Sequence, residues 1–287
     1  MITPAVDNES LTAGAVAILG TADPAAKIAA SRVLAAAWAN GALAVGDAVP
    51  PLRPARPDYP VLRPPREMPK RRALRSQAGR IALLHSLAHI ELNAIDLGWD
   101  IIARFGGPAL PRSFFDDWVG VAAEEASHFE LLAARLTEFG ARYGNLPAHD
   151  GLWEAAVATS EDLLARLAVV PLVLEARGLD VTPPMAERLE RAGDAPSGAI
   201  LRHIYRQEIG HVAVGRRWFE QLCHDRGLLP ERLFHECVRR YFKGDLKQPF
   251  NYAARSAAGF PANYYEPLGA SAGGEAGSLG PFDRRPA

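Results

Sequence analysis

The pattern Glu-x-x-His occurs at Glu125–His128 and again at Glu208–His211 in this 287-residue sequence. Residues three apart lie on the same face of a helix, so each copy can aim a carboxylate and an imidazole at one point. Glutamate and histidine together suit iron or manganese better than softer metals. We therefore interpret the two copies as halves of one metal centre.

The two copies belong to a longer repeat, because Glu91 lies 34 residues before Glu125 and Glu175 lies 33 before Glu208. These glutamates fall in apolar stretches, where an unpaired carboxylate is costly to bury. Arginines could neutralise them through ion pairs, but ion pairing does not explain the repeat. Two divalent cations would balance four carboxylates. The predicted metal ligands are Glu91, Glu125, His128, Glu175, Glu208 and His211.

Apolar residues at helical spacing predict four helices that would carry these ligands. They span about residues 77–105, 113–142 and 152–177, and a fourth begins after Pro196-Ser197. We expect the third to bend at Pro171 and to be broken by Gly178 and Pro183-Pro184, before a short helix near residues 185–191. Such a break would lie beside Glu175.

The first two predicted helices place their glutamates at the same height. Glu91 lies 14 residues before the end of the first helix, a rise of about 21 Å. Glu125 lies 12 residues after Ser113, the expected N-cap of the second, a rise of about 18 Å. In an antiparallel pair the two carboxylates would therefore meet.

The outer segments differ from these helices in composition. Residues 11–41 predict two short helices, with Asp23 before Pro24 as an N-cap, and eight prolines between 50 and 69 predict an irregular strap. A further helix is expected from 231 to about 242. The predicted organisation is N-terminal helices and strap (1–76), metal-binding bundle (77–222), C-terminal helix and irregular capping segment (223–268), and disordered tail (269–287).

Composition favours a soluble globular protein, with 48% hydrophobic residues, 23% charged residues and a net charge of −1. A near-neutral chain has no overall attraction to nucleic acid or membrane. No apolar run is long enough to span a bilayer, and no secretory signal is evident.

Cys223 and Cys237 form no disulfide framework, so we expect a cytoplasmic protein. The seven basic residues between Arg63 and Arg80 are either a solvated face or a polyanion contact.

At these residues the chain resembles the ferritin-like superfamily, and in detail the bacterial family DUF455. The resemblance runs from about Leu11 to Leu268 and includes HSLAHIELNAIDLGWD, EEASHFELLAARL, EARGLDVTPPM, IYRQEIGHVAVGRRWF and KQPFNYAARSAAGF. It implies an all-α fold, a ferritin-like four-helix bundle that holds two metal ions on the six residues given above. It implies no particular reaction.

Other residues could assist the centre. His85, His89 and Asp96 lie on a helix face next to that of Glu91, so they could orient the ligands, although a polar face paired with a neighbouring helix explains them equally well. Tyr205 could be a redox-active aromatic residue, or part of the core. Residues 250–265, which include Arg255, could cover the mouth of the site.

The leading hypothesis is an O₂-dependent oxidase or oxygenase with two iron ions, or manganese and iron. Its substrate would be a small molecule or, by similarity to ferritin-like hydroxylases that modify transfer RNA, an RNA. Alternatives are a ferroxidase or iron-handling protein, and a protein that uses the metals only for structure. The long extensions argue against a storage cage, so we expect a monomer or homodimer that does not bind membranes.

Overall fold

The computed structural model describes residues 10–69 and 73–269, and over these ranges it contains helices and isolated β-bridges but no strand. This confirms the all-α prediction. The helices are α1 (Leu11–Leu19), α2 (Pro24–Ala39), α3 (Gln77–Phe105), α4 (Arg112–Glu138), α5 (Gly151–Ala158), α6 (Leu163–Val169), α7 (Ala176–Arg191), α8 (Ala195–Asp225), α9 (Pro230–Tyr241), α10 (Tyr252–Ala257) and α11 (Ala262–Tyr265), with the π-helix η2 (Val170–Glu175) and the 3-10 turns η1 (Pro65–Glu67) and η3 (Glu266–Leu268).

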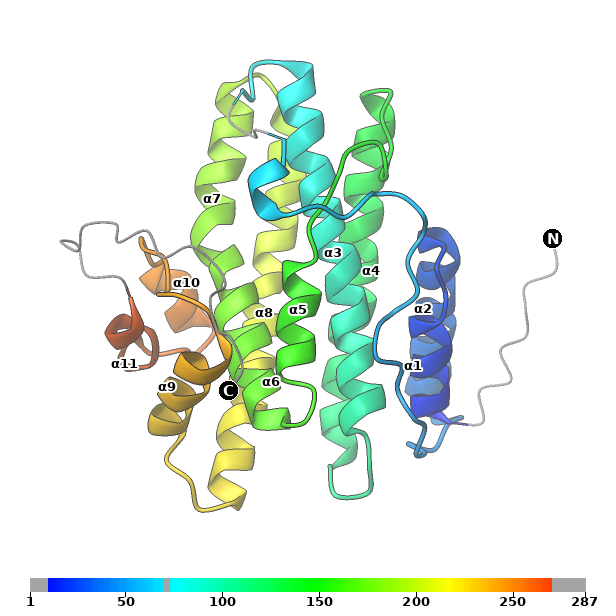
Figure 1. The fold of residues 1–287 in the computed structure, drawn as a ribbon, viewed down its shortest axis with the longest axis vertical. Helices are drawn as coiled ribbons and strands as arrows, with labels where there is room; N and C mark the ends of the chain where they lie inside the picture. Colours follow the sequence, from blue (N-terminus) through cyan, green and yellow to red (C-terminus); the bar gives the residue numbers. More distant parts are fainter. Residues whose placement is uncertain (1–9, 70–72, 270–287) are drawn as a thin grey trace, which may run out of the picture.

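Long helices that lie side by side form the core of the molecule (Figure 1). α3 packs along α4, α7 packs along α8, and α8 also contacts α4. The close approach of α3 and α4 depends on Gly98, because a Cβ at this position would lie 3.0 Å from the Cβ of Ala122. The apolar stripes predicted from the sequence face this interior, where Leu84, Ile95, Trp118 and Leu132 are buried.

The predicted bounds of α3 are confirmed, with the hydroxyl of Ser76 accepting a hydrogen bond from Gly79 N at 3.1 Å. α4 begins at Arg112, one residue before the predicted start, and ends at Glu138 rather than near 142. It ends early because Gly140 adopts a left-handed φ of 71°. α8 begins at Ala195, earlier than predicted, because the Asp194 carboxylate accepts from Ser197 N and caps the helix.

The chain between 151 and 191 differs most from the prediction. The single helix expected over 152–177 is divided into α5, α6 and η2, and the break expected at Gly178 is absent, since α7 continues from Ala176 to Arg191. A proline within a helix leaves the carbonyl four residues earlier without its usual donor. For Pro183 that carbonyl belongs to Leu179, and it accepts a hydrogen bond from Asn251 Nδ2 at 3.1 Å. The C-terminal extension therefore helps α7 tolerate its proline.

The N-terminal helices pack against α3 and α4, with the Asp23 carboxylate capping α2 as predicted. The strap that follows is irregular apart from η1, which also agrees with the prediction. It is fixed to α3 through Arg56, whose Nη2 lies 2.9 Å from Asp96 Oδ2. Part of the basic run, residues 70–72, lies outside the described residues.

The C-terminal extension forms α9, α10 and α11 beside α6 and α7 (Figure 1). Its main polar anchor is Arg255, which donates to Asp180 Oδ1 at 2.9 Å and to Oδ2 at 2.7 Å. Both side chains are buried. The tail predicted to be disordered lies, from residue 270, outside the described residues. In the part of the chain that the structure describes, no helix has the length and apolar character needed to cross a membrane.

Candidate metal centre

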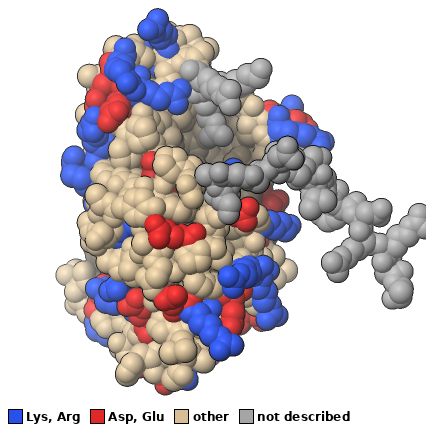
Figure 2. Space-filling view, turned by 90° about the vertical axis from the view of Figure 1, so that its left-hand side faces the viewer, with Lys and Arg blue, Asp and Glu red and all other residues tan. Residues whose placement is uncertain are grey.

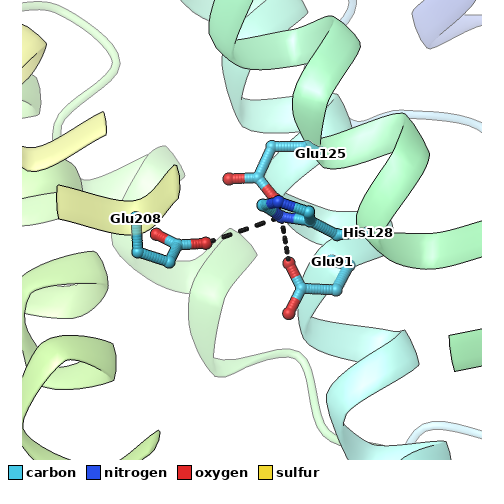
Figure 3. Close-up of side chains that lie close together, drawn as sticks. All are labelled: Glu91, Glu125, His128 and Glu208. Atoms are coloured by element: carbon cyan, nitrogen blue, oxygen red, sulfur yellow. Dashed lines mark hydrogen bonds and ion pairs between the residues drawn. The ribbon is translucent and has the colours of Figure 1, made fainter. Parts of the chain in front are cut away.

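α3 and α4 bring Glu91, Glu125 and His128 together, as the predicted helix heights require (Figure 3). His128 Nδ1 lies 3.1 Å from Glu125 Oε2 and 3.5 Å from Glu91 Oε2. All three side chains are buried. One turn of α4 therefore presents a carboxylate and an imidazole to the carboxylate of the neighbouring helix.

α8 supplies the second Glu-x-x-His copy from the opposite side. Glu208 Oε1 lies 3.7 Å from His128 Nδ1, and Glu208 Oε2 lies 3.6 Å from His211 Nδ1. His211 Nδ1 is also 3.0 Å from Glu125 Oε1. Glu91, Glu125, His128 and Glu208 each offer one ligand atom within 4.8 Å of the others, a spacing that could hold a metal ion. His211 adjoins this group through both Glu125 and Glu208.

Glu175 reaches the same place from the last residue of η2. Single π-helical turns are rare and occur often at functional sites. Glu175 lines the same cavity as Glu91, Glu125 and Glu208. Burial, together with the nearby charges of Glu208 and Glu125, raises the pKa of the Glu175 carboxyl to about 8. The structure thus brings this predicted ligand to the cluster on a π-turn that leads directly into α7.

Three buried polar atoms of the cluster make no hydrogen bond of good geometry among the described residues: Glu175 Oε2, and the pair Glu125 Oε1 and His211 Nδ1, which lie 3.0 Å apart. An unpaired polar atom in a protein interior is costly, and such atoms in a native fold commonly indicate an ion or water. All three are lone-pair donors of the kind that divalent cations bind. The donor set therefore fits a metal centre.

The pKa values show how strongly the carboxylates act on one another. Burial raises the pKa of Glu91 well above its usual value. Burial alone would also raise the pKa of Glu125, but His211 and His128 hold it far below its usual range. Despite burial, which acts in the opposite direction, Glu125 and Glu91 raise the pKa of His128 to about 11. Positive charge, carried by protons or by metal cations, therefore strongly stabilises this group of buried carboxylates.

The far side of each imidazole is held by the residue that precedes the other Glu-x-x-His copy. His128 Nε2 lies 3.0 Å from Gln207 Oε1, and His211 Nε2 lies 2.8 Å from Glu124 Oε2. An oxygen that accepts a hydrogen bond from Nε2–H keeps the ring oriented with Nδ1 facing the glutamates, where its lone pair can bind a metal. Sequence reasoning missed both orienting residues, although each stands one position before a predicted ligand.

The three residues predicted to orient the ligands bind elsewhere. His85 Nε2 accepts from Gly144 N at 2.9 Å, and His89 Nδ1 lies 2.8 Å from Tyr143 Oη. Asp96 forms a buried ion pair with Lys27 of α2, in addition to Arg56. They occupy the side of α3 that faces the 143–149 loop, the strap and α2. These contacts match the alternative of a polar helix face paired with its neighbours.

Tyr205 is half-buried, and its hydroxyl accepts from Asn251 Nδ2 at 3.2 Å. This contact fastens the C-terminal extension to α8. The redox role considered for Tyr205 stays a prediction.

A cavity of about 240 Å³ leads to the four glutamates. Its wall is mainly apolar, built from leucine, isoleucine, valine and alanine side chains of α3, α5 and α7. Gly178 lines it, and a Cβ at that position would meet no atom within 4 Å. A helix break was predicted at Gly178, but the residue lies within α7. Its missing side chain leaves open space in the cavity beside the glutamates.

Comparison with known proteins identifies a family of unknown function. Residues 20–266 match the family described as "Protein of unknown function (DUF455)". The chain belongs to the DUF455 family. A relative from Haemophilus influenzae, named "Uncharacterized protein", is 43% identical over 211 residues, which are 72% of this chain and 73% of that protein. No solved structure matches the chain.

Proposed function

We propose that this DUF455 protein is a ferritin-like di-metal carboxylate enzyme that uses O₂ to oxidise an apolar substrate, with two iron ions or one manganese and one iron. The observation that carries the proposal is the apolar cavity that ends at four glutamates, two of which, Glu125 and Glu175, each have a buried oxygen without a well-formed hydrogen bond among the described residues. A metal needed only for structure does not require such a cavity. Glu91, Glu125 and His128 would hold one ion, and Glu175, Glu208 and His211 the other.

In this proposal two carboxylates would bind both ions. Glu125 turns Oε2 to His128 and Oε1 to His211, at 3.1 and 3.0 Å. Glu208 does the same with its two oxygens, at 3.7 and 3.6 Å. Each carboxylate thus spans the two histidines, as a bridge between two metals does. The ligand set matches that of ferritin-like di-iron and di-manganese proteins, in which two helices each supply a glutamate and two each supply Glu-x-x-His.

Iron held in this way would supply the electrons that reduce O₂. The protein's own residues prepare the site for that chemistry. Gln207 and Glu124 keep the Nδ1 lone pairs of both histidines directed at the glutamates. The apolar wall excludes bulk water and positions an apolar group beside the cluster. Cys223 and Cys237 are free and buried, which suits the reducing cytoplasm that we propose as its location.

An RNA substrate is not favoured by the face drawn in Figure 2. Lys and Arg side chains gather in the upper part of this face and again near its lower end, but Asp and Glu lie beside them. Polyanion binding normally uses a continuous basic surface. The mixed charges and the apolar cavity together favour a small molecule with an apolar part.

Oxygen uptake by the iron-loaded protein tests the proposal. The wild type should bind close to two Fe²⁺ per chain and then consume O₂, whereas Glu125→Ala with Glu208→Ala should abolish both. Glu130→Ala, on the same helix but paired with Arg32 at the surface, is the matched control and should change neither. Iron binding without O₂ consumption would refute an oxidase and leave a structural metal site.

A further inference from the structure

A second cavity, of about 310 Å³, adjoins the cavity that reaches the glutamates. It lies between η2, the start of α7 and residues 242–250 of the C-terminal extension. Leucine, valine and phenylalanine side chains form much of its wall. Four basic residues also line it, against one acidic residue, Asp245; the basic residues are Arg177, Lys243, Lys247 and Arg255.

Arg255 adds a buried positive charge to the wall of this cavity. Its side chain is buried, and Asp180 binds Nε and Nη2. Nη1 is buried without a hydrogen-bond partner among the described residues. The ring of Tyr265 lies 4.4 Å from the guanidinium carbon and shields one face of the charge. Because Asp180 also contacts Arg177, at 3.4 Å, its single negative charge serves two arginines. The wall therefore keeps a net positive charge and an unused donor.

The two cavities share part of their lining. Leu174 and Arg177 line both of them, so η2 and the first turn of α7 form the partition between them. The inner cavity has an apolar wall that ends at the glutamates, and the outer one has the basic residues. A molecule that fills both would need an apolar part at the inner end and an anionic group at the outer end.

We propose that the substrate of the metal centre is an organic anion with an apolar arm. Its carboxylate or phosphate lies in the outer cavity, which Arg177, Lys243, Lys247 and Arg255 line, and its arm extends beside Leu174 toward the inner cavity. This assignment rests on the proposed function for its chemistry, but the binding can be measured on its own. Positive charge around a small cavity selects anions both by attraction and by the cost of leaving a buried guanidinium N–H unpaired.

Isothermal titration of the metal-loaded protein with matched eight-carbon probes tests the proposal. Octanoate or octyl phosphate should bind at least about tenfold more tightly than octanol, and octylammonium should bind more weakly still. The tighter of the two anions identifies the group as carboxylate or phosphate. Equal binding of octanol and both anions would overturn the assignment.

Two variants locate the site. Lys243→Gln with Lys247→Gln should weaken binding of the preferred anion by about tenfold, whereas Arg63→Gln with Arg226→Gln removes two exposed charges elsewhere and should change nothing. Gly178→Leu should fill the inner cavity and weaken binding of the eight-carbon anion. Unchanged affinity in both cavity variants would overturn the proposal. Metal content measured on the same samples separates this outcome from failure of the metal centre itself.

Discussion

Gln207 Oε1 accepts a hydrogen bond from His128 Nε2 at 3.0 Å, which ties α8 to the histidine of α4. The reverse contact runs from His211 on α8 to Glu124 on α4, at 2.8 Å. Each Glu-x-x-His copy is therefore oriented by the residue that precedes the other copy. Since Gln207 lies outside the predicted ligand set, it offers a test of the centre that leaves all six ligands intact.

We expect Gln207→Leu to weaken metal binding about 10–100-fold, because the His128 ring loses the acceptor that fixes its Nε2 proton and its orientation. Competition with a chelator of known affinity measures the effect. Gln221→Leu, an exposed glutamine on the same helix, is the control. Equal affinities for the two variants would mean that His128 needs no orienting partner.

His128→Ala and His211→Ala should lower metal affinity far more than His85→Ala or His89→Ala. The first pair contacts the glutamates, whereas the second pair is bonded to residues 143–149. We expect the second pair to lower the melting temperature while metal stoichiometry stays the same. Similar losses of metal in all four variants would show that α3 contributes a nitrogen ligand.

Burial lowers the pKa of His85 to about 4, below its value of about 6.5 in an unfolded chain. Between pH 4 and pH 6.5, His85 is protonated in the unfolded chain but neutral in the folded chain. A fall in pH therefore stabilises the unfolded state relative to the folded state. Above pH 6.5 the histidine is neutral in both states and contributes no pH dependence. From pH 7 to pH 5, this residue alone should lower the free energy of unfolding by about 2 kcal/mol.

Denaturant unfolding of His85→Gln checks this expectation, because glutamine can still accept from Gly144 N but does not titrate. The variant should lose less stability than the wild type on acidification over this range. Equal losses would show that His85 can be protonated within the fold.

An oxidase and an iron-storage protein differ in size and capacity. We expect a monomer or dimer by size-exclusion chromatography with light scattering, and iron uptake that stops near two per chain. The helices α1, α2 and α9 to α11 would have to be accommodated on any closed shell, which favours the smaller assembly. A large hollow particle, or uptake that continues well beyond two, would instead establish the ferroxidase and storage alternative.

The sequence was most informative where local signals and burial agreed. Ser76 and the glycines after Phe105 mark the two ends of α3. The apolar stripe then gives the position of Glu91 along the helix, so the contact between Glu91 and Glu125 could be predicted. Of the six predicted ligands, Glu91, Glu125, His128 and Glu208 offer atoms within 4.8 Å of one another, and Glu175 and His211 lie next to them. Glu208 and His211 follow from the same argument.

Contacts between distant segments explain what the sequence did not predict. Pro183 normally favours a helix end, but α7 continues because Asn251, from a segment 68 residues later, bonds the carbonyl of Leu179. His85 and His89 lie on the face next to Glu91, and only the position of the 143–149 loop shows that they bind away from the ligands. The spacing of residues along one helix does not show which segment of the chain packs against each of its faces.

Anomalous diffraction from crystals of the iron-loaded protein tests the central claim most directly. The account predicts two peaks at the iron edge within each chain, both bound by Glu125 and Glu208. One should contact His128 and the other His211. A single peak, or peaks away from these two glutamates, would contradict a di-metal centre.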